Sequence, residues 1–309
     1  MGLAIAVRFA SVLLAMVLLA GAVGERTASP DARSRGAPAV QGTAVAVVHP
    51  SPPVIAPASA RSKAPRISAP SAIVEDLDTG RVLFERDADA RWPIASLAKI
   101  MTAMLVLGSS GPGDEVRVSR WAAKQPPTNV GLRPGWRMRV DVLLYALMLH
   151  SANDVAVALA EHVAGTTGAF DRLMNRQAWA LGMANTRFAS PSGLRDAGYS
   201  TARDVAAMAR WAMASPAFAG LVGTRVRTIG LPNGHSLRLE NLNDLLFADP
   251  SVTGVKTGYT SAAHWSLAVT ASRGGHRLVA VVLGAPGHPF ADGERLLGYG
   301  FQVEAAGAA

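Results

Sequence analysis

Three short polar motifs lie far apart along this chain of 309 residues, and their joint occurrence constrains the fold more than any other feature. They are Ser96-Leu97-Ala98-Lys99, Ser151-Ala152-Asn153 and Lys256-Thr257-Gly258. Two of the four lysines fall in these motifs, although the chain otherwise takes its positive charge from arginine. Lysine can lose its proton at neutral pH when its environment favours it, whereas arginine cannot. A single site built from all three motifs requires distant segments to converge.

The first motif has the spacing of a nucleophile and its base. Apolar residues recur at helical intervals from Ser96 to Leu107, so Ser96 and Lys99 are expected on one helix face within reach of each other. A neutral amine there can accept the serine proton. Lowering a lysine pKa from about 10.4 to near neutrality costs roughly 4 kcal/mol, which burial and a second cation can supply. Lys256 is the candidate second cation, and the helix N-terminus favours a developing oxyanion.

Each motif alone is weak evidence. A Ser-x-x-Lys sequence is common at helix N-termini, a Ser-x-Asn sequence is more common still, and Lys-Thr-Gly is compatible with an ordinary strand edge and turn. The three motifs occur in order on a predicted helix, a predicted loop and a predicted strand, which makes coincidence improbable.

The remaining patterns predict an α+β protein. Two apolar runs, Ala72–Leu77 and Arg81–Glu85, flank a Gly-containing turn and indicate an opening hairpin. Helical periodicity predicts further helices over Val142–His150, Asp154–Val163, Phe170–Leu181, Thr201–Met213 and Glu294–Val303. Strands are predicted at Arg225–Ile229, Ser236–Leu239, Gly254–Thr260, Ser266–Ala271 and Arg277–Leu283, with turns at Asn233-Gly234 and Gly274-Gly275. We therefore expect a sheet with helices gathered on it.

The N-terminal part has the pattern of an exported protein. Arg8 precedes the apolar run Phe9–Leu19 and the small-residue site Ala20-Gly21-Ala22, which predicts a signal peptide over residues 1–22. An uncleaved anchor is the alternative, because Leu3–Val23 is nearly long enough to cross a bilayer. Residues 23–70 are rich in Pro, Ala, Ser and Arg without sustained periodicity and predict a tether, which leaves a folded domain at 71–309.

Charge and composition restrict the classes of binding partner. Of the net charge of +8, Arg8 contributes one, residues 25–66 contribute four and the rest of the chain three. The basic tether lacks interleaved aromatics, so we expect no nucleic acid and instead an anionic membrane or wall polymer, with a plain soluble spacer as the alternative. The absence of cysteine suits a domain large enough to rely on its core. The seven histidines show no H-E-x-x-H pattern, and we expect no metal.

On these motifs the chain resembles the D-alanyl-D-alanine carboxypeptidases, the low-molecular-mass penicillin-binding proteins, whose motif set is shared with class A β-lactamases. The likeness extends to the runs Pro93–Thr102, Leu181–Phe188 with Pro191–Leu194, and Tyr199–Asp204, and covers about Ser71 to Val303. It implies a β-lactamase/transpeptidase-like fold, in which an antiparallel sheet packed with helices is joined to a mostly helical lobe.

The resemblance implies roles for the matching residues in a reaction on serine. Ser96 attacks the carbonyl between two terminal D-alanines, Lys99 is its base, and Ser151 relays a proton toward the leaving amine. Asn153 holds the substrate amide.

On the third motif, the resemblance implies that Lys256 and Thr257 face the terminal carboxylate, and that Gly258 lets the substrate backbone approach the strand. The backbone N–H groups of Ser96 and Tyr259 form the oxyanion hole.

The resemblance therefore implies an exported serine D,D-carboxypeptidase on the cell-wall side of the cytoplasmic membrane or secreted. It acts on peptidoglycan stem peptides through an acyl-enzyme, is inhibited by penicillins and needs no cofactor. A D,D-endopeptidase and a class A-like β-lactamase are the alternatives. The second requires a carboxylate to activate water. No glutamate lies between Glu161 and Glu240. Of the aspartates in this interval, Asp171 and Asp204 fall on predicted helices, so Asp196 is left as a poor substitute for that carboxylate. An inactive wall-binding module is disfavoured, because the motifs are intact.

Two departures from the family pattern stand out. Few residues follow Phe301, so we expect no C-terminal membrane anchor. His264 stands near the position where the family commonly has a small Ala-Gly pair, and we expect this residue to pack rather than to reshape the pocket.

Overall fold

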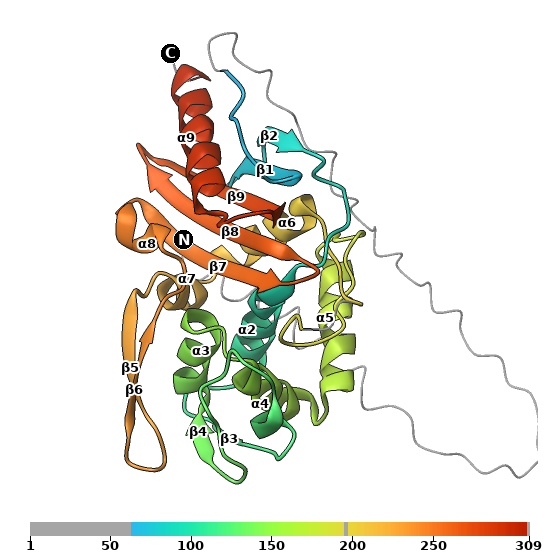
Figure 1. The fold of residues 1–309 in the computed structure, drawn as a ribbon, viewed down its shortest axis with the longest axis vertical. Helices are drawn as coiled ribbons and strands as arrows, with labels where there is room; N and C mark the ends of the chain where they lie inside the picture. The colour runs from blue at the N-terminus through green and yellow to red at the C-terminus, as the bar shows by residue number, and fades with distance from the viewer. Residues whose placement is uncertain (1–62, 195–196, 308–309) are drawn as a thin grey trace, which may run out of the picture. The chain divides into compact units, whose positions relative to one another are not determined.

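The computed structural model describes residues 63–194 and 197–307, so the predicted signal peptide and most of the predicted tether lie outside the described residues. Within them, the largest sheet is antiparallel and five-stranded, in the order β2-β1-β9-β8-β7 (Figure 1). Its strands are β1 (Ser71–Asp76), β2 (Val82–Arg86), β7 (Val252–Thr260), β8 (His264–Arg273) and β9 (His276–Ala285). The predicted opening hairpin and the three late strands of this sheet are confirmed.

The helices lie on both faces of the sheet and extend into a helical lobe (Figure 1). They are α2 (Ala98–Ser109), α3 (Val140–Leu149), α4 (Asn153–Ala164), α5 (Thr167–Ala180), α6 (Ala202–Met213), α7 (Pro216–Val222), α8 (Leu245–Ala248) and α9 (Phe290–Gly307), with the 3-10 turns η1 (Ala95–Leu97) and η2 (Ala122–Lys124). Small hairpins are formed by β3 (Glu115–Arg117) with β4 (Arg137–Arg139), and by β5 (Val226–Gly230) with β6 (Ser236–Glu240).

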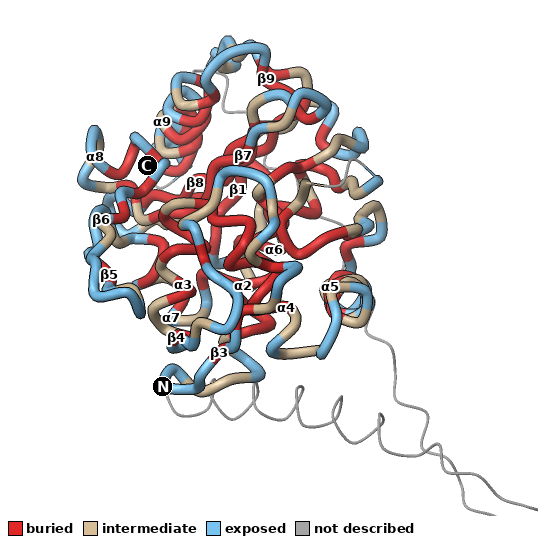
Figure 2. Tube along the Cα trace, turned by 60° about the horizontal axis from the view of Figure 1, so that its bottom comes forward, coloured by how far each residue is buried: buried red, intermediate tan, exposed pale blue. Residues whose placement is uncertain are grey.

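The sheet separates two hydrophobic clusters of the described chain. Because side chains alternate along a strand, Val279 and Val281 of β9 pack with α2 and α6, whereas Ala280 and Val282 pack with α9. Figure 2 shows how burial concentrates along the central strands and α2. The sheet is therefore covered on both faces.

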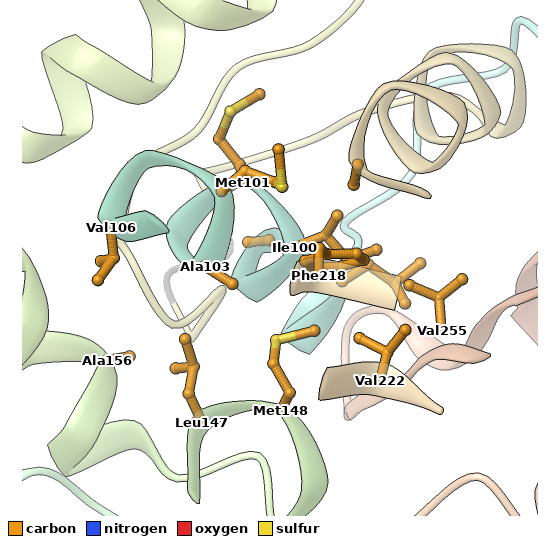
Figure 3. Packing of buried hydrophobic residues seen from close by; sticks show 14 of the residues in the cluster. Ile100, Met101, Ala103, Val106, Leu147, Met148, Ala156, Phe218, Val222 and Val255 are labelled. Carbon is orange, nitrogen blue, oxygen red and sulfur yellow. The ribbon is translucent and has the colours of Figure 1, made fainter. Parts of the chain in front are cut away.

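Helix α2 is buried almost all round, and this fixes the first motif in space. Its residues from Ala98 to Val106 are all buried. Figure 3 shows Leu147 and Met148 of α3 directed toward Ile100 and its neighbours on α2. A helix that is apolar on every side belongs in the interior of a protein, so the residue at its N-terminal end has little freedom to move.

The segment just before β1 is held against α9 by hydrogen bonds. The Asp292 carboxylate on α9 accepts hydrogen bonds from the backbone N–H groups of Ser68 and Ala69 and from the Ser68 hydroxyl, at 2.8–3.1 Å.

Among the described residues no single helix is long and apolar enough to span a membrane, and only α6 and α7 taken together, bent by 109°, meet the length and composition criteria.

One buried carboxylate lies between the sheet and α6. Glu75 on β1 is 4% exposed, and Arg210 Nη1 lies 3.2 Å from its Oε1 atom. Desolvation raises the pKa of Glu75 from 4.5 to about 7, because it outweighs the attraction of Arg210.

This shift predicts a stability that falls as pH rises from 4.5 to about 7, because the unfolded chain ionises at Glu75 before the folded chain does. A Glu75→Gln variant avoids this loss. We expect its unfolding free energy, relative to the unsubstituted chain, to rise by up to about 3 kcal/mol between acidic and mildly basic pH. Urea unfolding at both pH values measures it. The exposed Glu115→Gln variant should show no such change, and an equal effect of Glu75→Gln at both pH values would contradict the argument.

Candidate active site

The first motif forms a short polar contact at the end of a buried helix. Ser96 lies in the 3-10 turn η1, and Lys99 lies in the first turn of α2 with no exposed surface. Lys99 Nζ is 2.9 Å from Ser96 Oγ. The predicted proximity of these two side chains is confirmed by this distance.

Lys99 Nζ has two further partners, which determine what the amine can do. Asn153 Oδ1 and the Ser192 carbonyl each lie 2.8 Å away. Both are acceptors only. A neutral amine has two N–H donors and one lone pair, so it can satisfy both acceptors and direct the lone pair at the Ser96 hydroxyl. The arrangement therefore suits a lysine that accepts the serine proton.

Burial and charge both favour the neutral amine. Desolvation lowers the pKa of Lys99 well below its ordinary value, and the positive charge of Lys256 lowers it further, against the opposing effect of Asp154. Burial also lowers the pKa of Lys256, to about 7. The role of Lys256 as the second cation agrees with the sequence expectation.

Strand β7 brings the third motif to Ser96. Lys256 pairs with Ala268 of β8, and directly opposed residues share a sheet face, so Lys256 lies on the face that packs against α2. A Cβ atom at Gly258 would lie 3.0 Å from the Ser96 nitrogen and 3.1 Å from the Ile94 carbonyl oxygen. The close approach of β7 to the nucleophile therefore favours glycine.

The other two residues predicted on β7 differ in exposure. Thr257 is buried, and its carbonyl accepts a hydrogen bond of 3.0 Å from Lys256 Nζ. Tyr259 is 53% exposed, and its ring packs against that of Trp265 with centroids 4.8 Å apart. Its side chain thus lies at the rim of the site, while its backbone belongs to the strand.

The second motif enters through a strained turn. Ser151 is buried and has a φ of 61°, a left-handed conformation uncommon outside glycine and frequent at functional sites. Two residues later, Asn153 begins α4, and its side-chain amide bonds to Lys99 and to the Pro126 carbonyl. Within the described residues, no hydrogen bond joins the Ser151 side chain to the other two motifs.

The loop that faces this motif is held by α4. The backbone N–H of Asn153 donates to the Thr128 carbonyl at 2.7 Å, and the Asp154 carboxylate accepts from the N–H groups of Val130 and Leu132. Asp154 thus satisfies backbone N–H donors of the loop, and its buried negative charge acts to raise the pKa of Lys99.

Sequence reasoning gave no role to Ser192 and Gly193, although it recognised the run that contains them. Ser192 supplies the third partner of Lys99 through its backbone carbonyl. Gly193 has a φ of 80°, and a Cβ atom there would lie 1.8 Å from the Ala95 carbonyl oxygen. Ala95 itself has a φ of 46°. A carbonyl partner carries no side-chain signal, so only the run Pro191–Leu194 indicated this contact.

Two further expectations concern residues near the site. His264 is exposed at the start of β8, and its expected packing role stays a prediction. Asp171 and Asp204 do lie on helices, α5 and α6, and Asp204 accepts bonds from Asn185 and Thr186. Asp196 lies outside the described residues.

Comparisons with known proteins agree with this geometry. The family model described as D-alanyl-D-alanine carboxypeptidase, Peptidase_S11, matches residues 58–287. The D-alanyl-D-alanine carboxypeptidase DacF of Bacillus subtilis is 37% identical over 223 residues, covering 70% of this chain and 57% of the relative. The D-alanyl-D-alanine endopeptidase of Escherichia coli is 36% identical over 250 residues, covering 77% of this chain and 79% of the relative.

A solved structure confirms the predicted α+β fold class. The D-alanyl-D-alanine carboxypeptidase of Mycobacterium tuberculosis H37Rv matches with a TM-score of 0.75 at 32% identity, covering 79% of this chain and 95% of that one. The chain spans 57–63% of the length of several curated relatives that it matches.

The contact between Gly193 and Ala95 can be tested with matched alanine variants. Gly193→Ala combines a left-handed backbone with an overlap of atoms, and we expect it to lower the unfolding free energy by at least about 3 kcal/mol. Gly165→Ala has a similar φ of 74° but no atoms within 4 Å of the added Cβ, so about 1 kcal/mol is expected there. Urea unfolding measures both. Equal losses would show that the overlap is absent in solution.

Proposed function

This chain belongs to the D-alanyl-D-alanine carboxypeptidase family, peptidase family S11, and we propose that it removes the terminal D-alanine from peptidoglycan stem peptides as a serine hydrolase. The observation that carries the proposal is the buried Lys99 amine, 2.9 Å from Ser96 Oγ and bonded to two other acceptors. A base with a lowered pKa beside a serine is the arrangement that acyl transfer requires.

In the proposed acylation step, Lys99 takes the proton of Ser96 as the Ser96 oxygen attacks the carbonyl of the penultimate D-alanine. The negative charge that develops on the carbonyl oxygen is stabilised by the backbone N–H groups of Ser96 and Tyr259. A proton passes through Ser151 to the amide nitrogen, the C–N bond breaks, and free D-alanine leaves. The shortened peptide remains as an ester of Ser96.

In the proposed deacylation step, water attacks that ester. Lys99 and Ser151 take the water proton and return a proton to Ser96, which releases the peptide with a new terminal carboxylate. No cofactor takes part in either step.

Substrate binding uses the remaining motif residues. Lys256 and Thr257 face the terminal carboxylate of the peptide, and Asn153 holds an amide of the substrate while it contacts Lys99. Because the pKa of Lys256 is about 7, an anionic substrate favours its protonated form. The same residues would accept the carboxylate of a penicillin, whose ring carbonyl then acylates Ser96.

The location follows from the substrate. Peptidoglycan lies outside the cytoplasmic membrane, so we infer an extracytoplasmic protein, in agreement with the predicted signal peptide over residues 1–22. Contact of the basic N-terminal segment with a membrane or wall polymer remains a prediction.

A second candidate is cleavage of D,D-cross-bridges between stem peptides. The observation that favours it is the similarity to an Escherichia coli protein described as an endopeptidase, of which 79% is covered. Both reactions break the same type of bond, so the motif geometry serves either. Incubation with a linear pentapeptide and with a cross-linked dimer distinguishes them by which substrate is consumed faster.

The nucleophile is tested by intact-protein mass after mixing with benzylpenicillin, together with release of D-alanine from a pentapeptide. We expect one long-lived adduct on Ser96 and release of D-alanine, and neither in Ser96→Ala. Rapid loss of the adduct with hydrolysis of the drug would favour the β-lactamase alternative. An adduct that persists in Ser96→Ala would refute the assignment.

The two lysines predict a bell-shaped pH profile of kcat/KM. Activity rises as Lys99, whose pKa is lowered, becomes neutral, and falls as Lys256 loses its proton above about pH 7. Lys256→Arg keeps its charge, so the basic limb should flatten even if the maximum rate drops. Initial rates of D-alanine release, measured across the pH range for both proteins, check this pH profile. An unchanged basic limb in Lys256→Arg would exclude Lys256 as its origin.

A further inference from the structure

The β3–β4 hairpin and the loop between its strands concentrate positive charge. Residues 115–139 hold six cationic side chains and one carboxylate, a net +5, whereas residues 67–309 together carry +3. The six are Arg117, Arg120, Lys124, Arg133, Arg137 and Arg139. The rest of the folded region is therefore slightly negative, and the charge of this hairpin is not a general property of the surface.

Nearby carboxylates compensate the charge on β4. Glu115 lies 3.3 Å from Arg137, and Asp141 lies 2.6 Å from Arg139. Within residues 63–194 and 197–307, no ion pair involves Arg117 or Arg120. Lys124 and Arg133 have no ion pair in this described region either. Uncompensated charge therefore extends along the loop, and Arg117 and Arg120 carry the part of it where the loop leaves β3.

Arg117 and Arg120 line an open hollow of about 430 Å³ together with Val118, Ser119, Pro134 and Gly135. None of these residues is acidic. The N–H groups of Val118 and Gly135 are already bonded within the hairpin. Ser119 Oγ accepts from the Ala122 N–H at 2.9 Å, so its own proton can still be donated to a ligand. The hollow thus offers two guanidinium groups and a hydroxyl, all donors.

We propose that this hollow binds a phosphate group of an anionic polymer. Arginine presents paired donors that match phosphate oxygens. An internal phosphate of such a polymer has two unshared oxygens, and successive phosphates along the chain can meet the two guanidinium groups, whereas a single carboxylate meets one. Further phosphates along the polymer then meet Lys124 and Arg133 at the same hairpin.

The surface chemistry favours a polymer over a membrane. Among the large hydrophobic side chains that are exposed in the described chain, only Trp121, at 53%, lies in residues 115–139. A segment that enters a membrane interface needs a broad apolar face. The hairpin offers charge and a hollow instead.

The chain connects the hollow to the second motif. The loop that leaves Arg120 continues to Pro126 and Thr128, whose carbonyls accept bonds from Asn153. The hollow and the second motif are therefore joined through one loop. This inference concerns binding and does not rest on the proposed hydrolysis.

The test is binding of the full chain to fluorescent polyphosphate, measured by anisotropy at increasing salt. We expect Arg117→Ala/Arg120→Ala to bind at least about tenfold more weakly, because both substitutions remove charge-assisted contacts to the phosphate groups. The matched control is Arg172→Ala/Arg176→Ala, which removes the same charge from exposed positions on α5 and should change affinity less than about twofold.

Unfolding midpoints and benzylpenicillin adduct formation should be unchanged in both double variants, which shows that they fold. Equal weakening by both, or by neither, would overturn the proposal. Tighter binding to vesicles of phosphatidylglycerol and phosphatidylcholine would assign the surface to a membrane, and tighter binding to poly-L-glutamate would assign it to carboxylates. A chain without an adduct that still binds polyphosphate through the hollow would contradict only the proposed function.

Discussion

The buried amine of Lys99 is the constraint on which the rest of the structure depends. An ionised lysine in an apolar interior is costly, and desolvation shifts the group toward its neutral form. The chain keeps this amine buried by surrounding α2 with α3, α4, α6 and the sheet, so that the helix has almost no exposed face. The packing of the lobe therefore determines the protonation state on which the chemistry of the site depends. A looser lobe would admit water and restore the ordinary basicity of the lysine.

Much of this arrangement could be predicted from the sequence, because the signals were local. The helix that begins after Ser96 has clear periodicity, and glycine-containing turns separate the strands of the sheet. The 3-10 turns η1 and η2, the short helices α7 and α8 and the β3–β4 hairpin were not predicted. Each is too short for a periodic pattern, and α7 is defined mainly by the Ser215 cap and Pro216 at its first position. Long-range packing stabilises such elements more than their own propensity does.

The site itself divides in the same way. Side-chain groups such as Ser96, Lys99 and Asn153 carry a residue-type signal, and the structure brings the first and the last within hydrogen-bond distance of the Lys99 amine. The third partner of the amine is a backbone carbonyl 93 residues away in sequence, and a carbonyl is chemically the same in every residue. The requirement for glycine at position 193 comes from a neighbour that only the fold reveals, the Ala95 carbonyl. Sequence motifs do not reveal contacts that depend on backbone atoms far away in the sequence.

The two buried lysines also show why the first and third motifs depend on each other electrostatically. If both amines were protonated, Asp154 would be the carboxylate of the described residues that offsets the charge on Lys99. That carboxylate already accepts bonds from three backbone N–H groups, those of Val130, Leu132 and Val155. One lysine therefore gives up its proton more readily than the other. Lys99 has two acceptors for its remaining N–H donors and a hydroxyl for its lone pair, and so it is the better neutral amine. Lys256 is then left with the charge, on the strand where an anionic substrate can stabilise it.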